Sequence, residues 1–176
     1  LNGKSAATKY ISDNGLQKYG KMVEELSDKD LLFLQDADGK VTLVFRGTVT
    51  SEEFKFDANY IAFKKGGERQ SDYYEKLETR VRDGLQKLGV TEAERATGHS
   101  LGGNKAIWMA DLGLAKESIT FNPYIKPSVI GNGVHHIYRT PDDLAFLDPA
   151  TFRYDHSAIK KLVKKKPNIS YEILDE

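Results

Sequence analysis

Apolar side chains recur three and four positions apart in two stretches of the first half of the chain, which is the spacing of one face of an α-helix. The first stretch covers residues 12–26 and predicts a helix there. The second runs from Tyr73 to Leu88 and predicts a helix that Gly89 ends, because glycine readily takes the left-handed conformation that closes a helix. The first half of the chain is therefore expected to contain two amphipathic helices.

Between these two stretches the pattern changes to short apolar runs. Residues 31–35 and 40–46 are two such runs, and an Asp-Gly pair at 38–39 lies between them, which is typical of a β-hairpin turn. Residues 54–63 alternate aromatic and polar side chains and predict a further extended segment. We therefore expect an N-terminal β-hairpin.

After Gly89 short apolar runs alternate with helical stripes. The pattern predicts three strands and two helices in the order strand 95–99, helix 102–115, strand 118–122, strand 135–140 and helix 157–163. Strands that alternate with helices imply a mainly parallel sheet with helices on both faces. In such α/β sheets ligands bind beyond the carboxyl ends of the strands, so functional residues are expected there.

Composition narrows the function classes. The chain has 176 residues, which fits one domain over 1–176, and 26 Lys and Arg against 26 Asp and Glu, a balance that argues against a nucleic-acid binder. It has no cysteine, which excludes disulfides, thiolate catalysis and cysteine-ligated metal sites. There is no signal-peptide pattern or transmembrane run, and the first residue is not Met. We expect a processed product or a piece of a longer protein, exported or carried on a virion, with the compartment left open.

One motif carries chemistry: Gly-His-Ser-Leu-Gly at 98–102, followed by Gly103. It lies between a predicted strand and a predicted helix, the context in which a Gly-x-Ser-x-Gly sequence forms a nucleophile elbow. The serine of such an elbow sits on a strained turn, and side chains two positions away on either side would collide with the sheet and the helix. Ser100 is therefore the candidate nucleophile, and the helix that follows it favours a developing negative charge.

A serine nucleophile needs a base and a carboxylate that orients the base. Elimination among the four histidines leaves His156, because His99 is turned away from Ser100 and His135 and His136 belong to a strand, where core or surface positions explain them. The acid comes from the segment after the strand 135–140. Asp142 and Asp143 are equal candidates, and Asp148 is a weaker one because it lies farther from the strand end.

The motif at 98–103, preceded by Val-Phe-Arg-Gly-Thr at 44–48, resembles the class 3 (fungal-type) lipases of the α/β-hydrolase superfamily and their compact bacterial and phage relatives. The resemblance covers roughly residues 41–157 and implies a compact α/β-hydrolase fold. It places Thr48 and the backbone N–H of Leu101 in the oxyanion hole. It also favours Asp143 over Asp142, because the family has an Asn-Asp-aliphatic motif that resembles Asp-Asp-Leu at 142–144.

These residues together predict a serine hydrolase that cleaves carboxylic esters of lipids through an acyl-enzyme and needs no cofactor. Ser100 attacks, His156 transfers the proton and Asp143 orients the histidine. Two alternatives stay open: a short-chain esterase, and a non-catalytic binding module on a hydrolase fold.

The segment 153–166 is strongly basic. An ordinary solvated helix face is the favoured interpretation, and transient contact with an anionic membrane surface is the alternative. The basic residues concerned are Arg153, Lys160, Lys161, Lys164, Lys165 and Lys166.

Overall fold

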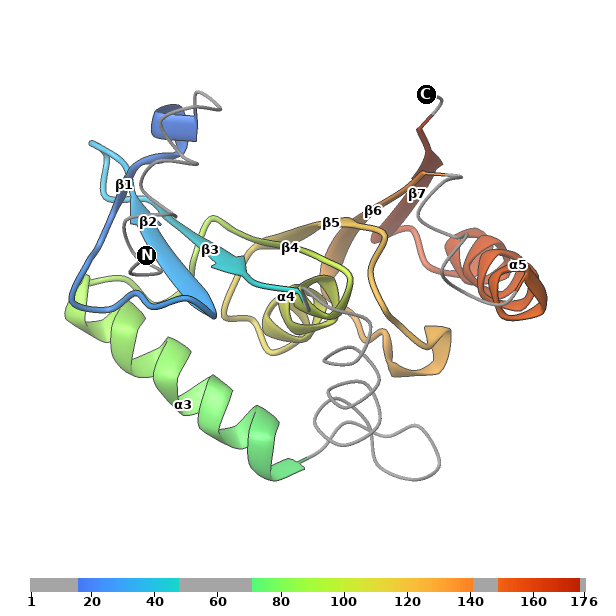
Figure 1. Ribbon diagram of the computed structural model, residues 1–176, viewed down its shortest axis with the longest axis horizontal. Helices are drawn as coiled ribbons and strands as arrows, with labels where there is room; N and C mark the ends of the chain where they lie inside the picture. Colours follow the sequence, from blue (N-terminus) through green and yellow to red (C-terminus); the bar gives the residue numbers. More distant parts are fainter. Residues whose placement is uncertain (1–15, 48–70, 141–148, 175–176) are drawn as a thin grey trace.

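The computed structural model describes residues 16–47, 71–140 and 149–174, and shows one seven-stranded sheet with three helices (Figure 1). The strands lie in the sheet in their order along the chain: β1 (Lys21–Met22), β2 (Leu31–Gln35), β3 (Val41–Phe45), β4 (Arg95–His99), β5 (Glu117–Phe121), β6 (Val134–Arg139) and β7 (Ile169–Ile173). Strands β1 to β3 are antiparallel, and β3 to β7 are parallel. The fold is thus α/β with a mixed, mostly parallel sheet, as the sequence predicts.

The N-terminal hairpin of β2 and β3 is confirmed. Its turn is closed by Asp36, whose Oδ1 accepts hydrogen bonds of 2.9 Å from the backbone N–H groups of Asp38 and Lys40. Gly39 adopts φ 81°, a value that glycine takes without strain. The Asp-Gly pair therefore acts as the turn that the sequence indicates.

The helix predicted over 12–26 is wrong for the part that the structure describes. A short 3₁₀ helix, η1 (Leu16–Tyr19), is followed by Gly20 at φ 115° and then by the edge strand β1. A side chain at Gly20 would overlap the backbone of Gln35 in β2, so the chain can lie this close to the hairpin only with glycine here. Pairing of β1 with β2 overrides the helical apolar spacing.

The three described helices lie on one face of the sheet, below the strands in Figure 1, rather than on both faces as the alternation predicts. They are α3 (Ser71–Lys87), α4 (Leu101–Asp111) and α5 (Pro149–Lys165). Crossovers between parallel strands are almost always right-handed, so a sheet whose strands follow one another in order places every crossover helix on the same side. Helices on both faces require a reversal in strand order, and β3 to β7 have none.

The core fills the space between the sheet and these helices. One cluster joins β2, β3 and β4 to α3 and α4, and a second joins β6 and β7 to α4 and α5. Helix α3 approaches β2 closely at Gly84, where a Cβ atom would lie 2.5 Å from the ring of Phe33. On the opposite face Phe121 and Val134 are 43% and 42% exposed, so the core is one-sided within the described residues.

The remaining predicted elements match with small shifts at their ends, with three exceptions. Helix α5 begins at Pro149, well before the predicted residue 157, and β7 has no counterpart in the prediction. The extended segment predicted over 54–63 lies outside the described residues.

Candidate active site

Ser100 joins the end of β4 to the start of α4 with φ 53° and ψ −123°, a strained conformation for a non-glycine residue. Its backbone is held on both sides. The N–H donates to the carbonyl of Phe121 at 3.2 Å, and the carbonyl accepts from the N–H groups of Gly103 at 3.0 Å and Tyr124 at 2.9 Å. The surroundings therefore fix a conformation that the serine would not adopt alone, and its side chain stays half-exposed.

The glycines around Ser100 are required by close backbone contacts. A Cβ atom on Gly98 would overlap the backbone of Gly102, and one on Gly102 would overlap the carbonyl oxygen of Phe45 in β3. A Cβ on Gly103 would lie 2.7 Å from the Cβ of Pro123, and one on Gly47 would lie 2.5 Å from the carbonyl oxygen of His99. The turn can pack between β3 and β5 only because these positions have no side chain.

A buried asparagine braces the turn from inside. Asn104 has no exposed surface, and its Oδ1 accepts a 2.6 Å hydrogen bond from the Tyr74 hydroxyl of α3. Its Nδ2 donates to the carbonyl of Tyr124 at 3.0 Å, and the N–H of Tyr124 bonds Ser100. Sequence analysis missed Asn104 and Tyr74, because no spacing rule links positions 30 residues apart.

A second link joins the ends of β5 and β6. Asn122 has φ 44°, and its side chain bonds Thr140 twice, Oδ1 to the backbone N–H at 2.8 Å and Nδ2 to Oγ1 at 3.0 Å. Thr140 is the last described residue before the acidic segment that the sequence singled out. This link holds Thr140 beside Asn122 at the carboxyl ends of β6 and β5.

Thr48, Asp142, Asp143 and Asp148 lie outside the described residues. Leu101 is the first residue of α4 and is 1% exposed. Backbone N–H groups in the first turn of a helix have no acceptor within the helix, so the N–H of Leu101 is suited to the oxyanion role that the resemblance implies.

His156 lies in α5 beside β7. Its Nδ1 is 2.8 Å from the hydroxyl of Tyr171. Tyr171 is in register with Ile137, Thr120 and Gly98 across β6, β5 and β4, so three strand spacings, about 14 Å, separate its strand from the strand that ends at Ser100. The described residues therefore do not bring His156 and Ser100 together.

Burial lowers the pKa of His156, and the nearby positive charges of Lys160 and Arg139 lower it further. The ring is therefore neutral at pH 7, the state in which a histidine can accept a proton. Arg139 is almost fully buried at the end of β6 and donates to the carbonyl of Pro123 at 3.2 Å.

The other histidines occupy the positions that the sequence predicts. His99 is exposed at the end of β4, and His136 bonds Ser170 and Glu117 on the sheet face away from the described helices. His135 is fully buried in β6, so it is a core histidine.

His135 belongs to a buried Ser-His-Asp set at the amino end of the parallel strands, the edge opposite Ser100. Its Nε2 and Nδ1 lie 2.7 Å from Asp111 Oδ1 and from Ser118 Oγ. The Asp111 carboxylate also accepts from the N–H groups of Gly131 and Gly133, at 2.7 and 2.9 Å. Since neither Ser118 nor His135 is exposed, no substrate reaches this set, and its role is to hold the strand ends together.

The charge of Asp111 is stabilised by these partners. Burial alone would raise its pKa, but the hydrogen bond and charge of His135 and the two glycine N–H groups outweigh burial and lower it. A carboxylate only accepts hydrogen bonds, so Nε2 of His135 donates to Asp111.

Lys166, in the basic segment, has an internal role: its Nζ donates to the carbonyls of Ile130 and Gly131, at 3.2 and 3.1 Å. Side chains 149–155, including Arg153, lie outside the description. Over the described ranges, no group of three histidine or carboxylate side chains is placed to hold a metal ion. In the same ranges, the helices are too short or too polar to cross a bilayer.

The fold and the turn define an α/β protein with a mostly parallel sheet and a strained serine between strand and helix. Comparisons with protein-family models, curated protein sequences and solved structures gave no significant match.

Proposed function

We propose that this protein is a serine hydrolase that cleaves carboxylic esters, with lipid esters as the substrate class, and that Ser100 is its nucleophile. The observation that carries the proposal is the backbone of Ser100. It has φ 53° at the point where a parallel strand passes into a helix, and the glycine positions around it have no room for a side chain. Strain of this kind persists only where the surroundings enforce it, and it exposes the serine at the carboxyl edge of the sheet.

Within this proposal the helix α4 and the N–H of Leu101 stabilise the oxyanion together with Thr48. One such donor is typically worth about 3–4 kcal/mol of barrier. His156, which elimination among the four histidines leaves, is the base, and Asp143, which the resemblance to class 3 lipases favours, is its orienting acid. Catalysis then requires the His156 ring to leave Tyr171, because a triad histidine uses Nδ1 for the carboxylate and Nε2 for the serine.

Hydrolysis of p-nitrophenyl esters tests these roles. Replacing Ser100 with Ala should abolish turnover while the circular dichroism spectrum stays unchanged. Of the variants Asp142→Asn and Asp143→Asn, only the second should lose activity by about 10⁴-fold, the effect typical of the triad acid. His156→Ala should be as damaging, and His136→Ala is the matched control that should keep full turnover. Unchanged turnover in the Ser100 variant would overturn the mechanism.

The position of His156 favours a second candidate, a binding module whose triad is not assembled. Its Nδ1 bonds Tyr171, and β7 lies three strands away from the strand that ends at Ser100. Such a module would bind its ligand at the strand ends and show no turnover with any ester. Within the enzyme class, hydrolysis of monomeric short-chain esters but not of phospholipid vesicles would identify a short-chain esterase.

A further inference from the structure

A cationic groove lies between α5 and β7, on the side of the molecule away from α3. It is an open depression of about 630 Å³, lined by His156, Ser157, Lys160, Lys161, Val163, Lys164 and Tyr171. Three of these seven described lining residues are lysines, one is histidine and none is acidic. The described side chains of the groove therefore present only positive or neutral groups to a ligand.

The lysines of α5 form a continuous like-charged surface. Lys160 and Lys164 are four residues apart, as are Lys161 and Lys165, so each pair lies on one side of the helix. Like charges at this spacing destabilise a helix by a few tenths of a kcal/mol per pair. Among the described side chains no carboxylate forms an ion pair with any of these four lysines.

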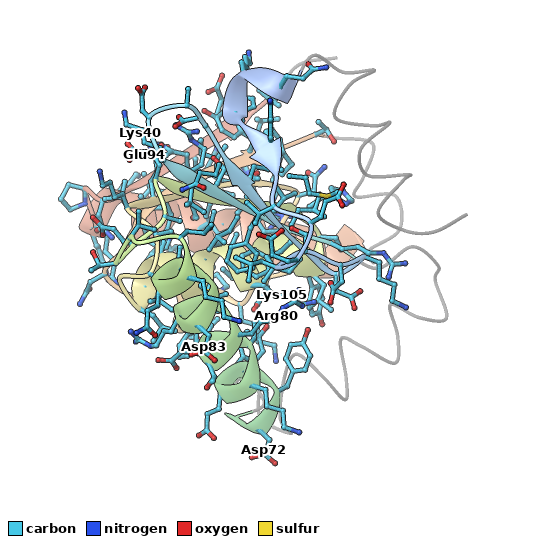
Figure 2. The ribbon with its side chains drawn as sticks, turned by 90° about the vertical axis from the view of Figure 1, so that its left-hand side faces the viewer. Lys40, Asp72, Arg80, Asp83, Glu94 and Lys105 are labelled. Carbon is cyan, nitrogen blue, oxygen red and sulfur yellow. The ribbon has the colours of Figure 1, made fainter. Side chains whose placement is uncertain are left out.

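Helix α3 shows what an ordinary solvated helix looks like in this protein. Acidic and basic side chains alternate along it, including Asp72, Arg80 and Asp83 (Figure 2), and Arg82 pairs with Glu78 at 2.8 Å. A solvated face needs no excess of one sign, and α5 differs from α3 in this respect. The charge of the whole chain is balanced, so the excess at α5 is local.

The groove also contains hydrogen-bonding groups beside the charges. The Tyr171 hydroxyl and the His156 ring, which both line the groove, are joined at 2.8 Å, and Ser157 is exposed. Lysine ammonium groups with nearby hydroxyl and imidazole groups suit a phosphate, which accepts several hydrogen bonds and carries negative charge. The stretch from Lys160 to Lys165 spans only about 8 Å of helix, so it fits a compact phosphate group rather than a long polyanion.

We propose that this groove binds the phosphate group of a small phosphorylated ligand or of an anionic lipid headgroup. Lys160, Lys161 and Lys164 supply the charge, and the exposed Ser157 hydroxyl supplies a hydrogen bond. Lys166 takes no part, because it holds the carbonyls of Ile130 and Gly131. The groove contains His156, the proposed base for Ser100, but phosphate binding rests on the lysines and does not require ester cleavage.

Two binding measurements on the full chain distinguish the sources of the phosphate. Calorimetric titration with inorganic pyrophosphate or glycerol 3-phosphate tests a soluble ligand, and co-sedimentation with vesicles of phosphatidylglycerol and phosphatidylcholine tests a headgroup, with pure phosphatidylcholine vesicles as the blank. Binding to pyrophosphate or glycerol 3-phosphate supports a site for a soluble phosphorylated ligand. Binding only to the phosphatidylglycerol vesicles supports a site for a lipid headgroup. Binding to neither probe overturns the proposal.

A matched pair of double variants locates the binding. Lys160→Gln with Lys164→Gln should weaken it about thirtyfold, the effect of two basic residues at an anionic surface. Lys76→Gln with Lys87→Gln removes the same charge from exposed positions of α3 and should leave binding unchanged. Equal loss in both double variants would show that only net charge matters and would overturn the assignment to the groove.

Discussion

Ser100, one of two described non-glycine residues with positive φ, is also the residue that the motif singles out. Its φ of 53° is held by hydrogen bonds from the backbones of Gly103 and Tyr124, and by the buried Asn104 behind them. Packing and hydrogen bonds around the turn thus offset the energetic cost of its strained backbone. Changes in these surroundings should therefore affect stability first and activity through it.

Gly102→Ala tests the packing of the turn. The new Cβ would overlap the carbonyl oxygen of Phe45, and backbone on both sides has to move, so we expect a loss of about 2–3 kcal/mol in the free energy of unfolding. Urea denaturation followed by circular dichroism measures it. Gly113→Ala is the control: φ is +75° there and nothing lies within 4 Å, so only the conformational cost of about 1–2 kcal/mol remains. Equal losses in both variants would contradict the close packing at Gly102.

At the scale of elements, the end of α4 and the start of β6 are tied together by Asp111. Its carboxylate bonds His135 and the N–H groups of Gly131 and Gly133, and its side chain is 9% exposed. This arrangement joins a helix, a loop and a strand at the amino edge of the sheet. It resembles a catalytic triad in its residue types, but it lies at the wrong edge and without access.

Asp111→Asn should lower the free energy of unfolding at pH 7 by about 2 kcal/mol. The carboxylate now accepts hydrogen bonds at both oxygens, whereas the amide would turn an N–H₂ donor toward one of these donors and leave both unpaired. The pKa of Asp111 is lowered in the folded chain, so the stability that its charge contributes is complete above its ordinary pKa of 3.8 and is lost as the pH falls through the folded value. The difference in free energy of unfolding between wild type and variant should therefore become smaller as the pH falls.

Urea denaturation of both proteins between pH 7 and pH 2.5 checks the expected narrowing. Asp83→Asn, at an exposed position of α3, is the matched control and should show almost no gap at any pH. A gap for Asp111→Asn that stays constant down to pH 2.5 would contradict the role given to its charge.

Elements with local signals were predictable from the sequence, and those that depend on distant partners were not. The hairpin turn at Gly39 and the end of α3 at Gly89 follow from the residues themselves, and both glycines have positive φ. Strand β1 could not be predicted, because Lys21 and Met22 become a strand only by pairing with β2. Strand β7 carries a local signal that the prediction overlooked, because Ile169, Tyr171 and Ile173 alternate with the polar Ser170 and Glu172.

At the scale of the whole molecule, the order of the strands in the sheet determines which face each helix covers. Alternating strands and helices predict a parallel sheet, but the face that each helix covers depends on the order of strands, which is a property of the fold and not of any segment. The order β1 to β7 places α3, α4 and α5 on one face (Figure 1). It also separates β7, with His156 beside it, from β4.

The candidate site divides in the same way. The strained turn at Ser100 and its glycines could be predicted, because their conformation is encoded within the six residues 98–103. The distance between Ser100 and His156 could not, because it depends on three intervening strand pairings. That distance also distinguishes the two proposed functions, because a hydrolase needs Ser100 and His156 in contact during catalysis and a binding module does not.

Covalent labelling by a fluorophosphonate tests the central claim most directly, because the reagent reacts with a serine only when a base activates it. We predict that wild-type protein gains one phosphonyl group, located on the peptide that contains Ser100, and that Ser100→Ala and His156→Ala gain none while Ser157→Ala is labelled as wild type. A wild-type chain that stays unlabelled, or that is labelled equally when Ser100 is replaced, would contradict the assignment of Ser100 as a catalytic nucleophile.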